Sequence, residues 1–368
     1  MENSAFIYIP DISGFTKFVT ETEISHSQHI ISELLEIIID GNELDFKVSE
    51  VEGDAVLFYN LGDAPTISDV LRQSENMFTK FHKHLAIIKR DSVCQCGACQ
   101  TSDTLTLKFI GHFGTLKEIA ISSFNKILGS DVILAHRLLK NNVANNEYIL
   151  FTDSYLKTQI EFNSSKLESL DLKENIEEFE NFGTVKTQYL TLSHLKKNIF
   201  VPIEEDVHKF NTIESKNFIT INAPLELVHS ALIDDKAKLK WVPGIINVES
   251  TDKISRINSK HTCIFNDQEV NIQTIASKRE NNILKYAELV KAKSGVSFVV
   301  NYFLSEENGG TKLSFLVEPD NTNKNKPIEK QNFFIKLKNK ILVYFITKNF
   351  KKSIVDFKNY CEQLASKK

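Results

Sequence analysis

Apolar positions in the first 200 residues follow two periods, which predict a mixture of strands and helices. Short, mostly apolar runs predict strands at 6–10, 45–51, 55–59, 105–110 and 148–151. Apolar residues three and four positions apart predict amphipathic helices at 25–40, 67–89 and 131–140. We therefore expect a first domain in which helices pack on a sheet.

The pattern changes after about residue 215. A short strand at 218–221 and a helix at 225–233 precede a series of strands and a long helix at 330–364. The predicted strands are 262–265, 270–276, 284–290, 296–303 and 312–317. The segment before them mixes charges with Pro202 and has no period. We predict domains at 1–198 and 215–368, joined by a linker at 199–214, in an α+β protein.

Composition agrees with a folded two-domain protein. The chain has 368 residues, of which 42% are hydrophobic and 25% charged, and one domain usually takes about 100–200 residues. A net charge of −4 gives no general attraction to nucleic acid. The first residues lack a basic and apolar leader, and no apolar run approaches the roughly 20 residues of a membrane span. We expect a cytoplasmic location.

Two carboxylates stand where predicted strands end. Asp11 follows the first strand, and Asp54 lies in the Gly-containing link between the strands at 45–51 and 55–59. If these strands are neighbours in an antiparallel sheet, both carboxylates meet at one sheet end, where their hard oxygens suit Mg²⁺. The alternative is that both are turn residues that bond to the local backbone.

Three ordered motifs resemble those of class III nucleotidyl cyclases over residues 5–195. They are Asp-Ile-Ser-Gly-Phe-Thr at 11–16, Gly-Asp-Ala at 53–55 and Gly-Ser-Asp-Val-Ile-Leu-Ala-His-Arg-Leu at 129–138. The resemblance implies a ferredoxin-like α/β sandwich that binds Mg²⁺ or Mn²⁺ through Asp11, Asp54 and the main chain of Ile12. It also implies that Arg137 stabilises charge on the transferred phosphoryl group, and that the site is built across a head-to-tail homodimer.

Three positions depart from the cyclase pattern: Ile133, Phe182 and Lys126. Ile133 replaces an asparagine that orients the ribose, and Phe182 aligns with a lysine that contacts the terminal phosphates. Glu50 stands at the position that selects the base, while Lys126 stands at its companion position. We expect Glu50 and Lys126 to form an ion pair in the nucleotide-binding pocket.

These departures leave three interpretations of the first domain. It binds Mg²⁺ and a purine nucleotide without cyclase activity, it is an active cyclase that converts a nucleoside triphosphate into a cyclic nucleotide and pyrophosphate, or it is a scaffold that binds neither. In phosphoryl transfer, positioning supplies much of the catalysis. The loss of positioning residues favours the first interpretation.

Three cysteines lie within six positions of each other, at Cys94, Cys96 and Cys99. Their thiolates can bind Zn²⁺ if a fourth ligand completes a tetrahedron. The histidines that we consider for this fourth position are His82, His84 and His112. The alternative is that the three cysteines are reduced thiols without a metal.

The second domain resembles START-like proteins, a superfamily that includes polyketide cyclases and lipid-transfer domains. The resemblance covers about 215–366 and begins at Ile-Asn-Ala-Pro-Leu-Glu-Leu at 221–227. It implies a helix-grip fold, in which a curved antiparallel sheet wraps the last helix and encloses a cavity for a hydrophobic small molecule or lipid. The candidate lining residues are aromatic: Trp241, Phe265, Tyr286, Phe298, Tyr302 and Phe345.

Two alternatives remain open for the second domain. Each aromatic residue can instead belong to an ordinary core. The lysines on the last helix can contact an anionic membrane surface, although a helix gripped by a sheet uses them as its solvated face. If the cavity carries the function, the protein is a carrier of an apolar ligand and its first domain is a scaffold.

Overall fold

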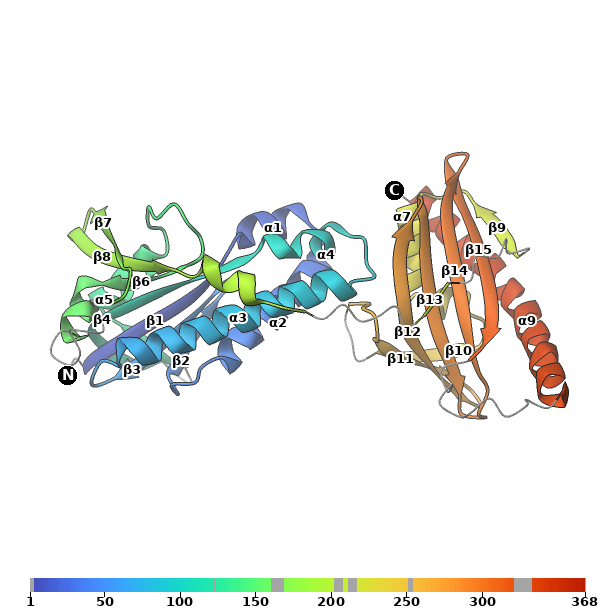
Figure 1. Ribbon diagram of the computed structural model, residues 1–368, viewed down its shortest axis with the longest axis horizontal. Helices are drawn as coiled ribbons and strands as arrows, with labels where there is room; N and C mark the ends of the chain where they lie inside the picture. Colours follow the sequence, from blue (N-terminus) through green and yellow to red (C-terminus); the bar gives the residue numbers. More distant parts are fainter. Residues whose placement is uncertain are drawn as a thin grey trace. The chain divides into compact units, whose positions relative to one another are not determined.

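The computed structural model describes residues 3–121, 124–159, 169–201, 208–210, 217–250, 254–320 and 333–367. The chain divides into two compact units, Met1–Arg90 with Cys96–Pro202 and Asp91–Gln95 with Ile203–Lys368. Each unit contains one sheet with helices (Figure 1), so the protein is α+β as predicted. Most of the predicted linker at 199–214 lies outside the described residues.

The first unit begins with β1 (Asn3–Ser13), which lies inside its sheet between β3 and β4. The order of the main strands is β2-β3-β1-β4-β6-β8-β7, and β5 pairs with β4. The further strands are β2 (Lys47–Glu52), β3 (Ala55–Leu61), β4 (Thr106–Ile121), β5 (Phe124–Leu128), β6 (Tyr148–Thr152), β7 (Lys173–Phe179) and β8 (Gly183–Thr191). The helices include α1 (Phe15–Glu21), α2 (Ile24–Asp40), α3 (Ile67–Asp91), α4 (Gly97–Thr101), α5 (Ser130–Leu138) and the 3₁₀ turns η1 (Ser102–Thr104) and η2 (Ser193–Asn198).

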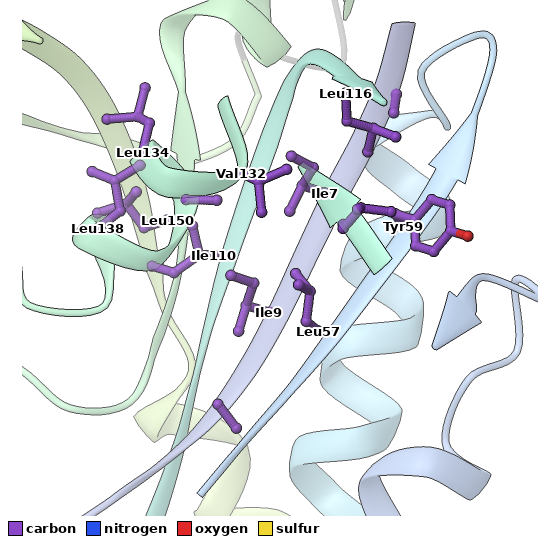
Figure 2. Close-up of a cluster of buried hydrophobic side chains, with 14 of the residues drawn as sticks. Ile7, Ile9, Leu57, Tyr59, Ile110, Leu116, Val132, Leu134, Leu138 and Leu150 are labelled. Atoms are coloured by element: carbon purple, nitrogen blue, oxygen red, sulfur yellow. The ribbon is translucent and has the colours of Figure 1, made fainter. Parts of the chain in front are cut away.

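Strand β1 is buried on both faces. On one face, Ile7 and Ile9 belong to a cluster that includes Val132 and Leu138 of α5 (Figure 2). On the other face, the hydroxyl of Tyr8 lies 2.7 Å from that of Ser74 on α3. Burying one such side chain contributes about 1.5–3 kcal/mol, which fixes β1 between helices. Any charged group at the end of this strand is therefore drawn into the interior.

The start of α5 is held against β4 by a carboxylate. Asp131 accepts a 2.7 Å hydrogen bond from the backbone N–H of Thr115 and lies 3.1 Å from His112 Nε2. This approach requires Gly114, because a Cβ at that position would lie 2.3 Å from Asp131 Cγ. The contact fixes the helix that carries Ile133 and Arg137.

The second unit contains one antiparallel sheet in the order β10-β11-β12-β13-β14-β15-β9. Its elements are β9 (Phe218–Ile221), α7 (Leu225–Ile233), α8 (Lys238–Trp241), β10 (Ile245–Ser250), β11 (Lys260–Phe265), β12 (Glu269–Glu280), β13 (Ile283–Ala292), β14 (Ser297–Glu307), β15 (Gly310–Pro319) and α9 (Phe333–Ser366). The elements follow one another along the chain as predicted, and α8 and β10 are additions to the prediction. Helix α9 packs on the unit through aromatic contacts such as Phe357 with Trp241, whose ring centroids are 4.9 Å apart.

Within the described ranges, no helix combines the length and apolarity that a membrane crossing needs.

We predict that Asp131→Asn lowers the free energy of unfolding at pH 7 by about 1–2 kcal/mol, because charge-assisted hydrogen bonds are lost. The hydrogen bond with His112, helped by those from Thr115 and opposed by burial, lowers the pKa of Asp131. Its stabilisation is therefore present above the unfolded pKa of about 3.9 and is lost as the pH falls through the lower folded value. Urea unfolding between pH 7 and pH 2 measures this.

Asp153→Asn is the control, because Asp153 is an exposed carboxylate that pairs with Lys157. In Asp153→Asn the free energy of unfolding should fall with decreasing pH as it does in wild type. In Asp131→Asn this fall should be smaller. Parallel acid dependence in wild type and Asp131→Asn would contradict the assignment.

Candidate functional site

Asp11 and Asp54 lie together at one end of the sheet. Strands β1 and β3 are antiparallel neighbours, which is the condition for the two carboxylates to meet, and Asp11 lies opposite Ala55. Asp54 directly precedes Ala55, and its carbonyl oxygen accepts a 2.9 Å hydrogen bond from the N–H of Ile12. Gly53, at a φ of 60°, supplies the left-handed backbone that the link before Asp54 needs. The predicted hairpin therefore brings the two carboxylates to the same sheet end.

Burial makes both carboxylates hard to ionise. Asp11 is only 7% exposed, and burial raises its pKa against the opposing effect of Lys108. Burial also raises the pKa of Asp54, and the negative charge of Asp11 adds to this rise. A positive charge at this position favours the ionised form of both groups.

Lys108 already supplies one positive charge, and the sequence prediction did not include it. It lies opposite Asp11 in the pairing of β1 with β4, and its Nζ is 3.0 Å from Asp11 Oδ2. The same ammonium donates a 2.8 Å hydrogen bond to the carbonyl of Leu139. The sequence feature that could have pointed to Lys108 is a lysine within the strand Thr-Leu-Lys-Phe-Ile, whose other residues are buried. Its pairing with Asp11 follows only from the position of β4 beside β1.

The carboxylates of Asp11 and Asp54 fit a hard divalent cation, and Lys108 competes with such an ion for Asp11. Asp11 and Asp54 offer carboxylate oxygens, the ligands that Mg²⁺ and Mn²⁺ prefer. Two carboxylates and one ammonium leave a single net negative charge, which is weaker attraction for a divalent ion than the bare pair provides. Occupation by a cation requires Lys108 to release or share Asp11.

The ion pair predicted between Glu50 and Lys126 is present. Lys126 Nζ on β5 lies 3.4 Å from Glu50 Oε2 on β2, and the two side chains are 55% and 29% exposed. Glu52 and His136 lie beside this pair, since the ligand atoms of Glu50, Glu52 and His136 are within 4.8 Å of one another. Exposed ion pairs contribute only about 0–1 kcal/mol. A ligand can therefore compete for either partner at low cost.

Helix α5 presents two of the positions that the cyclase resemblance singles out. Ile133 is 54% exposed and offers no hydrogen bond. The guanidinium of Arg137 lies over the ring of Phe182, 6.0 Å from its centroid, a distance at which a cation and an aromatic ring attract each other. Arg137 must leave or share this ring to contact a phosphate.

The three clustered cysteines lie beside a histidine that the sequence prediction did not include. His26 Nδ1 is 3.2 Å from the sulfur of Cys96 and 3.6 Å from that of Cys99. The ligand atoms of His26, Cys94, Cys96 and Cys99 all lie within 4.8 Å of one another.

The choice of His82, His84 or His112 as the fourth member of this group was wrong. Their side chains bond elsewhere: His82 with Thr106, His84 with Glu33 and His112 with Asp131. His26 lies on the first turn of α2, far from the cysteines in sequence. Only the packing of α2 against α4 brings it near them.

The second unit contains a mainly apolar cavity of about 410 Å³. Four predicted residues line it: Trp241, Phe265, Phe298 and Tyr302. The other two predictions were wrong. Tyr286 is buried outside the lining, and Phe345 is 57% exposed. Because α9 faces the cavity with Ile346, Asn349, Phe350 and Ser353, position 345 is rotated away from it.

A buried ion pair forms the polar wall of this cavity. Lys238 Nζ lies 2.9 Å from Glu288 Oε1, and both side chains are 2% exposed. Burial acts to lower the pKa of Lys238, but Glu288 and Asp235 outweigh it, so the pKa is raised. The hydroxyl of Tyr302 donates to Glu288 Oε2 at 3.2 Å. Nearby, the indole N–H of Trp241 has no acceptor among the described residues.

We predict that Lys108→Met raises the pH at which Asp11 titrates by about 1–3 pH units, because an opposite charge at this distance favours ionisation. Carboxyl ¹³C NMR of protein labelled at aspartate measures this, and Asp11→Asn assigns the signal. Lys126→Met is the matched control, since it removes the same charge beside Glu50 and should leave Asp11 unchanged. An Asp11 signal that titrates at the same pH in Lys108→Met and wild type would refute the role of Lys108.

The first unit is similar to solved cyclase domains at low identity. The catalytic core of a rhodopsin-guanylyl cyclase with converted specificity, in complex with ATPalphaS, is 15% identical, with a TM-score of 0.39 over 52% of this chain and 97% of that chain. The adenylyl cyclase CyaB from P. aeruginosa is 14% identical, with a TM-score of 0.37 over 52% and 95%. A bacterial light-regulated adenylyl cyclase is 13% identical, with a TM-score of 0.36 over 54% and 100%.

Sequence comparison gives a family. Residues 31–148 match the family described as "Protein of unknown function (DUF2652)". The "Uncharacterized protein Rv2561/Rv2562" of Mycobacterium tuberculosis (strain ATCC 25618 / H37Rv) is 31% identical over 163 residues, which are 44% of this chain and 74% of the relative. The chain therefore belongs to the family of this mycobacterial protein.

Proposed function

We propose that the first unit binds a purine nucleoside triphosphate together with Mg²⁺ or Mn²⁺ at Asp11 and Asp54, without converting it efficiently into a cyclic nucleotide. The observation that carries this proposal is the pair of carboxylates at one sheet end, buried Asp11 and half-buried Asp54, with an ammonium already bonded to Asp11. The sequence motifs around Asp11, Asp54 and Arg137 give the nucleotide as the ligand class.

The pair of carboxylates supports binding of a cation. Both have raised pKa values, so an added positive charge lowers the free energy of their ionised forms. The bound ion supplies contacts to the phosphates and polarisation of the ribose 3′-hydroxyl. Asp11 and Asp54 hold it, with the carbonyl of Ile12 as the third donor that the resemblance implies. Lys108 turns from Asp11 toward the added negative charge of the phosphates.

The exposed pair of Glu50 and Lys126 supports binding of a purine base. Glu50 accepts hydrogen bonds from the N–H groups of a purine, and Lys126 donates to its carbonyl or ring nitrogen. These bonds replace an exposed ion pair that contributes little. Glu50 is the residue type found in guanylate cyclases, while Lys126 changes its charge environment, so both GTP and ATP are candidate ligands.

Three features argue against efficient cyclisation. Ile133 cannot hold the ribose, Lys108 competes for a metal ligand, and the guanidinium of Arg137 lies over the ring of Phe182. Each disturbs the positioning on which phosphoryl transfer depends, and a small misplacement costs about 100-fold in rate.

We also propose a symmetric homodimer, because the resemblance implies a site shared by two copies.

We predict that the full chain binds GTP or ATP in the presence of Mn²⁺ and that Asp11→Asn and Asp54→Asn each weaken this binding at least about tenfold, or about 1.4 kcal/mol. Isothermal titration calorimetry measures the affinity and the number of sites per chain. Asp153→Asn, which removes an exposed carboxylate, should bind like wild type.

Two outcomes would overturn this proposal. Release of a cyclic nucleotide from GTP or ATP with Mn²⁺, lost in Asp54→Ala, would establish an active cyclase. Absence of metal-dependent nucleotide binding in a folded protein would leave the first unit as a scaffold.

A second function is favoured by the cavity of the second unit. We propose that it binds a small molecule with an apolar body and an acceptor group, consistent with the START-like resemblance. Its volume of about 410 Å³ is in the range of ligand sites. The apolar walls suit the body of such a molecule, and the indole N–H of Trp241 suits its acceptor. This function is that of a carrier or of a sensor that acts on the first unit.

We predict that the fluorescent dye anilinonaphthalene sulfonate binds this cavity. Excitation of Trp241, the only tryptophan of the chain, should then produce dye emission by fluorescence energy transfer. Val300→Phe narrows the cavity and should abolish this transfer. Val355→Phe adds the same bulk at a position that is 49% exposed and should bind like wild type. Equal energy transfer in all three proteins would show that the dye binds elsewhere.

A further inference from the structure

His26, Cys94, Cys96 and Cys99 form a group with the composition of a closed metal site. Their four ligand atoms lie within 4.8 Å of one another. We propose that these residues bind one structural Zn²⁺ ion. This site goes beyond the proposed nucleotide function and does not depend on it, because none of its ligands belongs to the carboxylate pair.

The separations within the group agree with tetrahedral zinc. Zn–S bonds of about 2.3 Å and Zn–N bonds of about 2.0–2.1 Å place sulfur and nitrogen about 3.6 Å apart in a tetrahedron. The observed distances from His26 Nδ1 are 3.6 Å to the sulfur of Cys99 and 3.2 Å to that of Cys96. Four atoms this close leave room for one ion and none for a larger cluster.

The local chain holds the ligands in this arrangement. Cys96 directly precedes α4, and Cys99 lies one turn later on the same short helix. Cys94 is two residues before Cys96, so its thiol stays near the others. Across the group, the carboxylate of Glu23, three residues before His26, accepts a 3.3 Å hydrogen bond from the N–H of Ala98. This bond joins the cysteine loop to the first turn of α2.

Ligand chemistry selects zinc over the ions proposed for the nucleotide site. Thiolates and imidazole are soft or intermediate donors, which Mg²⁺ and Mn²⁺ bind poorly and Zn²⁺ binds well. Three thiolates and a neutral imidazole fill all four positions of the tetrahedron. With no position left for water, the ion has no catalytic role, and it cross-links α2 to the loop that precedes β4.

The experiment starts from the full chain purified without chelator. Elemental analysis should find about one zinc ion per chain, and thiol modification should release it. After the zinc is removed, added Co²⁺ should give sulfur-to-cobalt charge-transfer absorption and the intense visible bands of a tetrahedral ion. Zinc affinity should fall as the pH is lowered, because protons compete for thiolate and imidazole.

Variants distinguish this site from other thiols. Cys96→Ser and His26→Ala should lose most of the zinc, whereas Cys263→Ser, which removes a buried cysteine of β11 outside this group, should keep it. If the first two variants fail to fold, the cobalt spectrum of wild type still decides, since only a group rich in thiolates gives it. Absence of zinc and of cobalt–thiolate absorption in folded wild type would overturn the proposal, as would full zinc content in folded Cys96→Ser or His26→Ala. Nucleotide binding is measured separately, so the two proposals fail independently.

Discussion

The burial of β1 on both faces is the constraint on which the first unit depends. Apolar side chains on alternate positions fill one core toward α5 and another toward α3. Asp11 lies near the end of this strand, so packing that stabilises the sheet also removes a carboxylate from water. An unpaired buried charge is costly. The ion pair with Lys108, the raised pKa values and the proposed affinity for a metal ion all follow from this one placement.

Much of the fold could be predicted from the periodicity of the sequence. Helices α2 and α3 and the long α9 have regular apolar faces, and β1 and β6 are continuous apolar runs. Strands β5, β7, β8 and β10 were not predicted, because they are short, polar or exposed and derive their place from hydrogen bonding to a neighbour. Such strands carry little hydrophobic signal of their own.

The candidate site was predictable where a motif is contiguous and unpredictable where packing assembles it. Asp11, Asp54 and the Glu50–Lys126 pair come from ordered motifs and their spacing. Lys108 and His26 acquire meaning only from strand order and helix packing, because nothing near them in sequence marks a partner. Phe345 shows the same limit on a smaller scale, since one position along a helix changes its direction by about 100°.

The central claim is that the first unit retains nucleotide and lacks efficient cyclisation. The most direct measurement incubates the full chain with radiolabelled GTP or ATP and Mn²⁺, then follows both the nucleotide retained with the protein and the cyclic product. The account predicts that the triphosphate is retained in a metal-dependent manner and recovered unchanged. Cyclic nucleotide as the main product, or no retention by a folded protein, would contradict it.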